Sequence, residues 1–145
     1  MSTETNKAIV RRLHEEVWTK RRLELLEEFI AEDFGEYDEQ PVPGHKSRDI
    51  LRASIGSALE ALPDFQITLH DVIAEGNKVA IRYTSTATHQ GELLGIPATG
   101  KHLEMSGATI FHLDKDKITQ FWGFNDNLGL MQQLGVTLTP GESGA

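Results

Sequence analysis

The stretch Asp64–His89, which reads DFQITLHDVIAEGNKVAIRYTSTATH, decides the fold class of this chain. From Phe65 to Leu69 every second residue is apolar, which is the pattern of a β-strand with one buried face. The alternation slips at Val72 and Ile73, where two apolar residues are adjacent. This slip predicts a β-bulge near 70–71, because one extra residue in a strand moves the following side chains to the opposite face.

Further strands are expected on either side of two short turns. The turn EGNK at 75–78 predicts a hairpin that leads into a strand over 79–89. After a long connection, residues 103–113 and 118–126 alternate in the same way, and the turn DKDK at 114–117 joins them. The chain from residue 64 onward is therefore predicted to form an antiparallel sheet.

The residues before this sheet have the periodicity of helices. Apolar residues recur every three or four positions over 5–19, over 23–30 and over 47–62, and Pro63 ends the last of these segments. A short helix is also expected at 127–135, after the last strand. Helices followed by strands predict an α+β fold, in which three N-terminal helices pack on a curved antiparallel sheet as a cone-shaped α+β barrel.

Length and composition limit the function classes. The chain has 145 residues, a formal net charge of −8 and no cysteine. This length fits one domain, which we place at 1–135, with 136–145 as a flexible tail. The acidic charge argues against nucleic-acid binding, and the absence of cysteine excludes disulfides and thiolate ligands. No metal-ligand motif, membrane span or signal peptide is apparent. We therefore expect no metal, no membrane partner and a cytoplasmic protein.

The turn at 114–117 sets a predicted register for the last two strands. If Lys115 and Asp116 form a two-residue loop, Leu113 faces Ile118, and counting outward places Met105 opposite Asp126. The same counting places the predicted site residues of the last strand on the apolar, helix-covered face: Gln120, Trp122, Phe124 and Asp126. The sequence thus predicts a carboxylate on the inner side of the sheet.

Two ionisable side chains on this inner face are candidates for catalysis. A carboxylate in an apolar pocket loses hydration and becomes a stronger base, which suits proton transfer on a carbon next to a carbonyl. Asp126 and, at the end of an earlier strand, His89 are these candidates. Two other roles stay open at this point. An aspartate at a strand end also serves as a helix cap, and an inward histidine also occurs as a hydrogen-bonded core residue.

Three sequence segments resemble the SnoaL-like polyketide cyclases, which have the nuclear transport factor 2-like, or ketosteroid isomerase-like, fold. These are THQGELLGIPATGK at 88–101, WGFND at 122–126 and LGLMQQLG at 128–135. The resemblance implies an intramolecular aldol ring closure without metal, cofactor or covalent intermediate. It implies that Asp126 is the general acid/base, and we interpret His89 as a polar pocket partner of Asp126 or of the substrate.

The resemblance is incomplete in one place and leaves the reaction open. Members often have a His-Asp pair where this chain has Tyr37 and Asp38. The further substrate-binding residues that we predict are Trp18, Tyr37, Met105, Gln120, Trp122 and Phe124, and the expected ligand is a small hydrophobic or aromatic molecule. The alternatives are a non-catalytic binding module and a related isomerase or dehydratase.

The opposite face of the sheet is expected to be free of helices and to form a homodimer or a higher homo-oligomer. The residues predicted on this face are Ala80, Arg82, Thr84, Thr86, Phe121 and Gly123.

Overall fold

The computed structural model describes residues 2–35, 47–137 and 139–141. Its first part is helical. Helix α1 (Thr3–Arg12) continues directly into a π-helical segment, η1 (Leu13–Thr19), and a 3-10 turn, η2 (Leu23–Leu25), leads into α2 (Leu26–Phe29). Helix α3 (Arg48–Ala61) completes this part, as the periodicity predicted.

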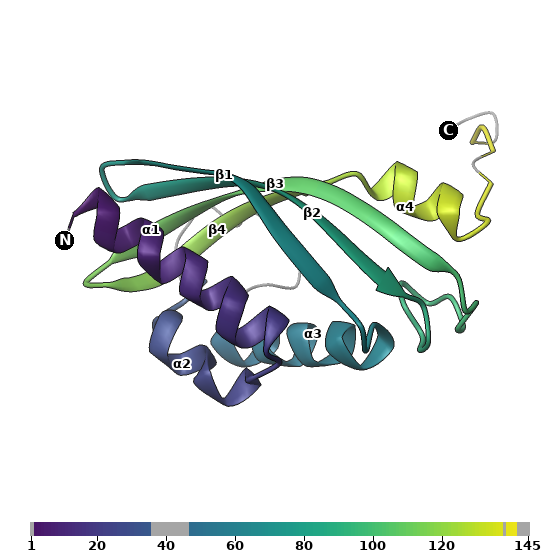
Figure 1. Cartoon of the computed structure of the whole chain (residues 1–145), viewed down its shortest axis with the longest axis horizontal. Helices are drawn as coiled ribbons and strands as arrows, with labels where there is room; N and C mark the ends of the chain where they lie inside the picture. Colours follow the sequence, from purple (N-terminus) through teal and green to yellow (C-terminus); the bar gives the residue numbers. More distant parts are fainter. Residues whose placement is uncertain (1, 36–46, 138, 142–145) are drawn as a thin grey trace.

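The second part is a single antiparallel sheet in the order β1-β2-β3-β4. The strands are β1 (Gln66–Glu75), β2 (Lys78–Thr88), β3 (His102–Asp114) and β4 (Lys117–Asn125), and α4 (Asn127–Gln133) follows them. The sheet is curved and open at its edges. Figure 1 shows α1, α2 and α3 gathered against one side of it and α4 at the far end. The predicted cone-shaped α+β fold is confirmed.

Local hydrogen bonds explain where the longer helices begin and end. Ser2 and Ser47 precede α1 and α3, and each hydroxyl oxygen accepts the backbone N–H three residues later, at 3.0 and 3.1 Å. Arg21 donates from its guanidinium to the carbonyls of Leu59 and Leu62 at the end of α3. The carbonyls at a helix C-terminus lack partners within the helix, so Arg21 links the first helical segment to the last turn of α3.

The hydrophobic core lies between the helices and one face of the sheet, which we call the inner face. Side chains at Val79, Ile81 and Phe111 on this face pack against the helices and are at most 5% exposed. The helical residues of the same cluster are Val10, Leu13, Val17, Leu26, Phe29, Leu51, Ile55 and Leu59. A second, smaller cluster lies near α4 and includes Leu103, Leu130 and Leu134 at its centre.

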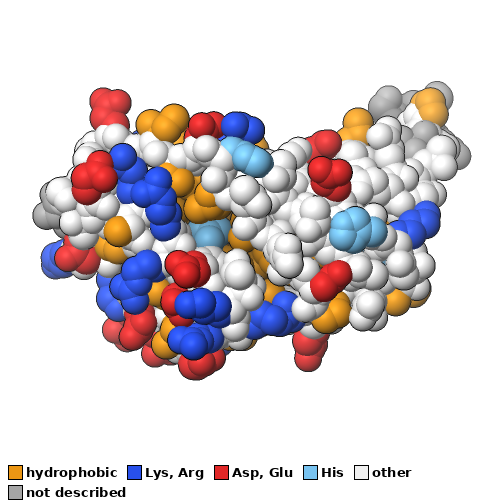
Figure 2. Space-filling model, in the orientation of Figure 1, with side chains coloured by type: hydrophobic (Ala, Val, Ile, Leu, Met, Phe, Trp, Pro, Cys, Tyr) orange, Lys and Arg blue, Asp and Glu red, His pale blue; other side chains and the backbone are white. Residues whose placement is uncertain are grey.

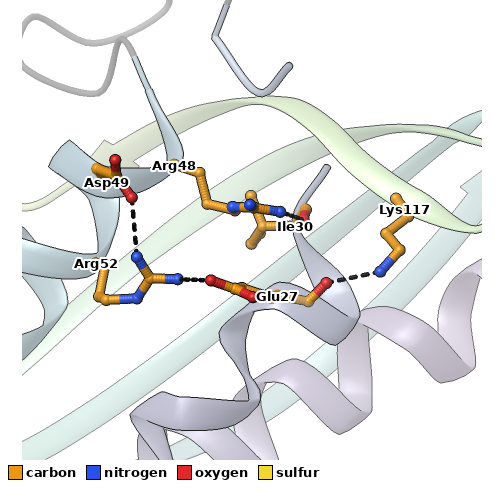
Figure 3. A network of polar contacts seen from close by, with 6 residues as sticks. All are labelled: Glu27, Ile30, Arg48, Asp49, Arg52 and Lys117. Atoms are coloured by element: carbon orange, nitrogen blue, oxygen red, sulfur yellow. Dashed lines mark hydrogen bonds and ion pairs between the residues drawn. The ribbon is translucent and has the colours of Figure 1, made fainter. Parts of the chain in front are cut away.

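A chain of polar contacts joins α2, α3 and β4 at the surface (Figure 3). Arg52 bonds Asp49 at 2.9 Å and Glu27 at 2.6 Å, while Lys117 donates to the carbonyl of Glu27 at 2.6 Å. Arg48 donates to the carbonyl of Ile30 at 3.4 Å. Exposed ion pairs of this kind contribute about 0–1 kcal/mol each, so the network orients α2 and α3 more than it stabilises them.

Two bulges set the strand registers. In β1 the pairing with β2 shifts between Leu69 and Asp71, which confirms the bulge predicted from the adjacent apolar residues. In β3 and β4 the pairs Leu113–Ile118 and Asp114–Lys117 also follow the prediction. Beyond them the register shifts, because His112 pairs with Gln120 and Thr119 is an extra residue.

The bulge at Thr119 makes the rest of the predicted β4 register wrong. Phe111 pairs with Phe121 instead of Gln120, and every later residue of β4 faces the side opposite to the predicted one. Hydrogen bonds at the bulge explain why it forms. Thr119 Oγ1 bonds the imidazole of His112 at 2.9 Å, and the carbonyl of Thr119 accepts the N–H of Gly35 at 3.2 Å.

Candidate functional site

A row of four inner-face residues, one from each strand, crosses the middle of the sheet. Leu69 pairs with Tyr83, Tyr83 with Gly107, and Gly107 with Asn125. The Tyr83 hydroxyl donates to Oδ1 of Asn125. A Cβ atom on Gly107 would lie 2.6 Å from Asn125 Oδ1 and 2.7 Å from the Tyr83 hydroxyl, so the pair occupies space that only glycine leaves empty.

A second glycine, Gly123, lies on the inner face one row closer to the core. In the neighbouring row Ile81 pairs with Thr109 and Thr109 with Gly123. A Cβ on Gly123 would lie 3.8 Å from Thr109 Oγ1 and 3.9 Å from Phe121 Cε2, which is ordinary van der Waals contact. Half-buried Phe121 lies beside Gly123. The inner face therefore has two glycines in neighbouring rows, and the Tyr83–Asn125 pair covers one of them, Gly107.

The phenol of Tyr83 is a protonated donor in this setting. Its side chain is half-buried, and burial raises the pKa of the hydroxyl above its usual value of 10.0. Tyr83 therefore keeps its proton throughout the physiological range and continues to donate to Asn125. Asn125 is exposed, and its Nδ2 group has no hydrogen-bond partner among the residues that the structure describes.

A buried histidine on the helical side was not predicted as a site residue. His14 lies in η1, 7% exposed, with its ring edge-on to Phe111 at 5.7 Å between centroids. Burial lowers the pKa of His14 below 6.5, although its bond to the Val10 carbonyl opposes this. The ring is neutral at pH 7. A carbonyl can only accept, so Nδ1 donates to Val10 at 2.8 Å and Nε2 holds the lone pair.

The surface view is consistent with an apolar furrow on this side of the molecule. Figure 2 shows hydrophobic side chains and one histidine in a furrow beside the charged helical end, whereas charges are sparse over the other half.

The sequence contained a signal for His14, because it follows Val10 by four residues and so lies on the apolar stripe of the first helix.

The structure does not bury Asp126, and the prediction that it points into the core side of the sheet is wrong. The bulge at Thr119 places Asn125, not Asp126, on the inner face. Asp126 is exposed and is the N-cap of α4, where its Oδ1 accepts the N–H of Gly129 at 2.8 Å. It remains adjacent in sequence to Asn125, at the end of the strand.

His89 lies inward, as predicted, but it is held within the protein. It is 0% exposed, and Nδ1 accepts the backbone N–H of Thr99 at 3.2 Å, which places the ring proton on Nε2. Nε2 is buried without a hydrogen-bond partner. Because no solvent-accessible space touches Nε2, a ligand can reach it only after a shift of the surrounding side chains. Its catalytic role stays a prediction.

The predicted substrate-binding residues divide between the two faces. Met105 and Trp18 are half-buried on the helix side, and the Trp18 ring lies 5.2 Å from that of Phe65. Trp122 and Phe124 were predicted on the inner face, but they lie on the opposite one. Trp122 pairs with Ile110 there and has the Lys78 ammonium 5.7 Å from its ring.

The other residues named in the sequence analysis also differ from their predicted placements or lie outside the described residues. Phe124 is 66% exposed. Gln120 pairs with His112 instead of Phe111 and is 2% exposed, and its two buried amide atoms have no hydrogen-bond partner among the described residues. Phe121 and Gly123 were expected on the open face, and the bulge puts them on the inner one. Tyr37 lies outside the described residues.

Two surface depressions of the molecule lie away from the predicted catalytic residues. One shallow depression lies between η2 and α3 and another beside α4, and neither includes Asp126 or His89. The described residues contain no group of three His, Asp or Glu side chains that could hold a metal ion. None of the helices in residues 2–35, 47–137 and 139–141 is long and apolar enough to cross a membrane.

Comparison with known proteins identifies the family. A model of the SnoaL-like polyketide cyclases matches residues 8–134. The chain belongs to the SnoaL-like polyketide cyclase family. No protein with a curated function matches the sequence significantly.

Solved structures of the family's fold are similar over most of their length. A candidate polyketide cyclase from Acidithiobacillus ferrooxidans is 28% identical, with a TM-score of 0.79 over 93% of this chain and 98% of that one. TsrD from Streptomyces laurentii is also 28% identical, with a TM-score of 0.79 over 90% and 97%. AclR from Streptomyces galilaeus, a candidate hydroxylase, is 25% identical, with a TM-score of 0.79 over 92% and 98%.

Proposed function

We propose that this SnoaL-like chain is an enzyme that closes a ring in a hydrophobic, aromatic polyketide-type substrate by an intramolecular aldol reaction. The proposed reaction uses acid/base chemistry of the protein without a metal or cofactor. The proposed proton shuttle is Asp126. Family membership supports the substrate class, but the neighbours include proteins named for different reactions, so the reaction itself rests on the residues of the site.

The observation that supports this proposal most strongly is the arrangement of apolar and polar groups on the inner face. Gly123 has no side chain beside half-buried Phe121, and a flat aromatic ring fits against such an apolar surface. The Tyr83–Asn125 pair lies at one side of this surface, and Asp126 is the residue after Asn125 in the chain. A hydrophobic body with carbonyl groups at one end matches this arrangement of apolar and polar groups.

The proposed steps conserve all atoms of the substrate. The Asp126 carboxylate takes a proton from the carbon next to a carbonyl, and the electron pair moves onto the carbonyl oxygen as an enolate. The enolate carbon then bonds to a second carbonyl carbon of the same molecule, and the alkoxide formed takes the proton back from Asp126. A hydrophobic substrate that covers the carboxylate removes water from it, which makes it a stronger base.

The test compares Asp126→Asn with the wild-type protein on aromatic β-keto esters. Ring closure leaves the mass unchanged, so the product is detected as an isomer with an altered absorption spectrum in liquid chromatography with mass detection. We expect Asp126→Asn to lower the rate by about 10²- to 10⁴-fold while the circular dichroism spectrum is retained. The control is Asp33→Asn, which neutralises another exposed aspartate. An Asp126→Asn rate equal to that of the control would refute the shuttle role.

One observation favours a non-catalytic binding module as a second candidate. Asp126 is exposed and bonded to the backbone of α4, which is how a purely structural cap behaves. The two candidates differ in deuterium exchange. An enzyme accelerates exchange at the carbon next to the carbonyl of 2-acetylnaphthalene in D₂O, whereas a binding module takes up the same compound without accelerating its exchange.

A further inference from the structure

The Tyr83–Asn125 pair has features of an oxygen-binding site. Both residues lie on the inner face, and both are in one row with Gly107. The side-chain oxygen of Asn125 is occupied by the Tyr83 hydroxyl, so the group that Asn125 presents outward is its Nδ2 amine with two protons. A donor-only group of this kind is suited to a carbonyl or phenolic oxygen.

The bond from Tyr83 also strengthens this donor. A hydrogen bond accepted by an amide oxygen polarises the amide and makes its N–H groups better donors. Because the Tyr83 hydroxyl stays protonated, this polarisation is present throughout the physiological pH range. The glycine at 107 is part of the arrangement, since any Cβ there would collide with both polar atoms and with the carbonyl of Phe124 at 2.7 Å.

We propose that Asn125, polarised by Tyr83 and seated in the space left by Gly107, binds the carbonyl oxygen of the substrate that becomes the enolate oxygen. This inference rests on the proposed function and adds the group that receives the negative charge. Donors aimed at the atom where charge develops stabilise a transition state more than they stabilise the ground state. Asp126 is the next residue in the chain, so the base and the oxygen-binding group come from consecutive positions.

The experiment measures recognition of an aromatic oxygen without turnover. The probes are 2-naphthol and naphthalene, which differ by one hydroxyl oxygen, and their dissociation constants are measured by equilibrium dialysis. We expect the wild-type protein to bind 2-naphthol about 2- to 10-fold more tightly than naphthalene, the range expected for one hydrogen bond. Asn125→Leu, which keeps a similar volume, should reduce this ratio to about one.

Two further variants and one control keep the result interpretable if Asn125→Leu folds poorly. Tyr83→Phe should reduce the ratio partly, and Gly107→Ala should abolish it because the added methyl displaces both polar groups. Ser106→Ala is the matched control, because Ser106 is exposed on the opposite face and should leave the ratio unchanged. The Asn125 side-chain N–H₂ signals should move in ¹H–¹⁵N spectra on addition of 2-naphthol.

The outcomes separate this inference from the proposed function. Equal binding of the two probes, or no binding of 2-naphthol by the wild-type protein, would overturn the role of Asn125. A ratio that is unchanged in Asn125→Leu would also overturn it. Asp126→Asn should keep the 2-naphthol preference even where it removes turnover, so a failure of Asp126 as the shuttle leaves the oxygen site standing.

Discussion

Protonation of His14 should reduce the stability of the fold in mildly acidic solution. The imidazole is buried against Phe111, and burial lowers its pKa below the value of 6.5 that applies in the unfolded chain. Above pH 6.5 the ring is neutral in both states, so it adds no pH dependence. Below pH 6.5 the unfolded chain binds a proton that the native protein still excludes, and the free energy of unfolding falls as the pH is lowered.

The size of this effect follows from proton linkage alone. While one proton is bound by the unfolded chain and not by the native protein, the free energy of unfolding changes by about 1.4 kcal/mol per pH unit. The loss continues from pH 6.5 down to the native pKa of His14 and then stops. His14→Phe removes this titration and keeps an aromatic ring beside Phe111, so its stability should depend less on pH over the same interval.

The assay is urea unfolding of the wild-type protein and of His14→Phe at half-unit steps from pH 7.5 to pH 5.0. Carboxylates and the other histidines titrate in both proteins, so the quantity of interest is the difference between the two free energies at each pH. His70→Phe serves as the control for removing an imidazole, because His70 is exposed and bonds the Thr84 hydroxyl at 2.8 Å. A wild-type-minus-His14→Phe difference that is constant from pH 7.5 to pH 5.0 would refute the burial argument.

Two other predictions concern stability and assembly. Ser47→Ala removes the hydroxyl that accepts the Ile50 N–H at 3.1 Å at the start of α3. The free energy of unfolding measured in urea titrations should therefore fall by about 1 kcal/mol. Ser57→Ala, within the same helix, is the control. The homodimer predicted from sequence would use the open sheet face, where Ile110 is 39% exposed and pairs with Trp122. Ile110→Glu should therefore convert a dimer into a monomer in analytical ultracentrifugation at micromolar concentration, and a wild-type protein that sediments as a monomer would contradict the prediction.

Much of the fold could be predicted because its signals are local. The change from a period of three to four residues to a period of two marks the boundary between helices and sheet near Pro63. The bulge in β1 was visible because Val72 and Ile73 break an otherwise regular alternation, and the pairing confirms it. The two-residue loop of Lys115 and Asp116 also forms as predicted, with positive φ angles of 51° and 64°.

The bulge at Thr119 could not be predicted in the same way. Aromatic residues follow on both faces of β4, at Phe121 and Phe124 among others, so a shift of one residue replaces one apolar pattern by another. The contacts that select the observed register come from distant parts of the chain. Ala31 donates its N–H to the Ile118 carbonyl at 2.9 Å, next to the bulge.

This single inserted residue decides which of two neighbouring side chains, Asn125 or Asp126, lies on the inner face of the sheet. Without the bulge, Asp126 would share the inner face with Met105, and a charged group would have to lose its hydration beside an apolar cluster at a cost of several kcal/mol. With the bulge, the neutral amide of Asn125 takes the inner position and the carboxylate stays in water as a cap. The fold thereby keeps the charge at the exposed end of β4, and in the proposed reaction Asn125 supplies the neutral donor for the enolate oxygen.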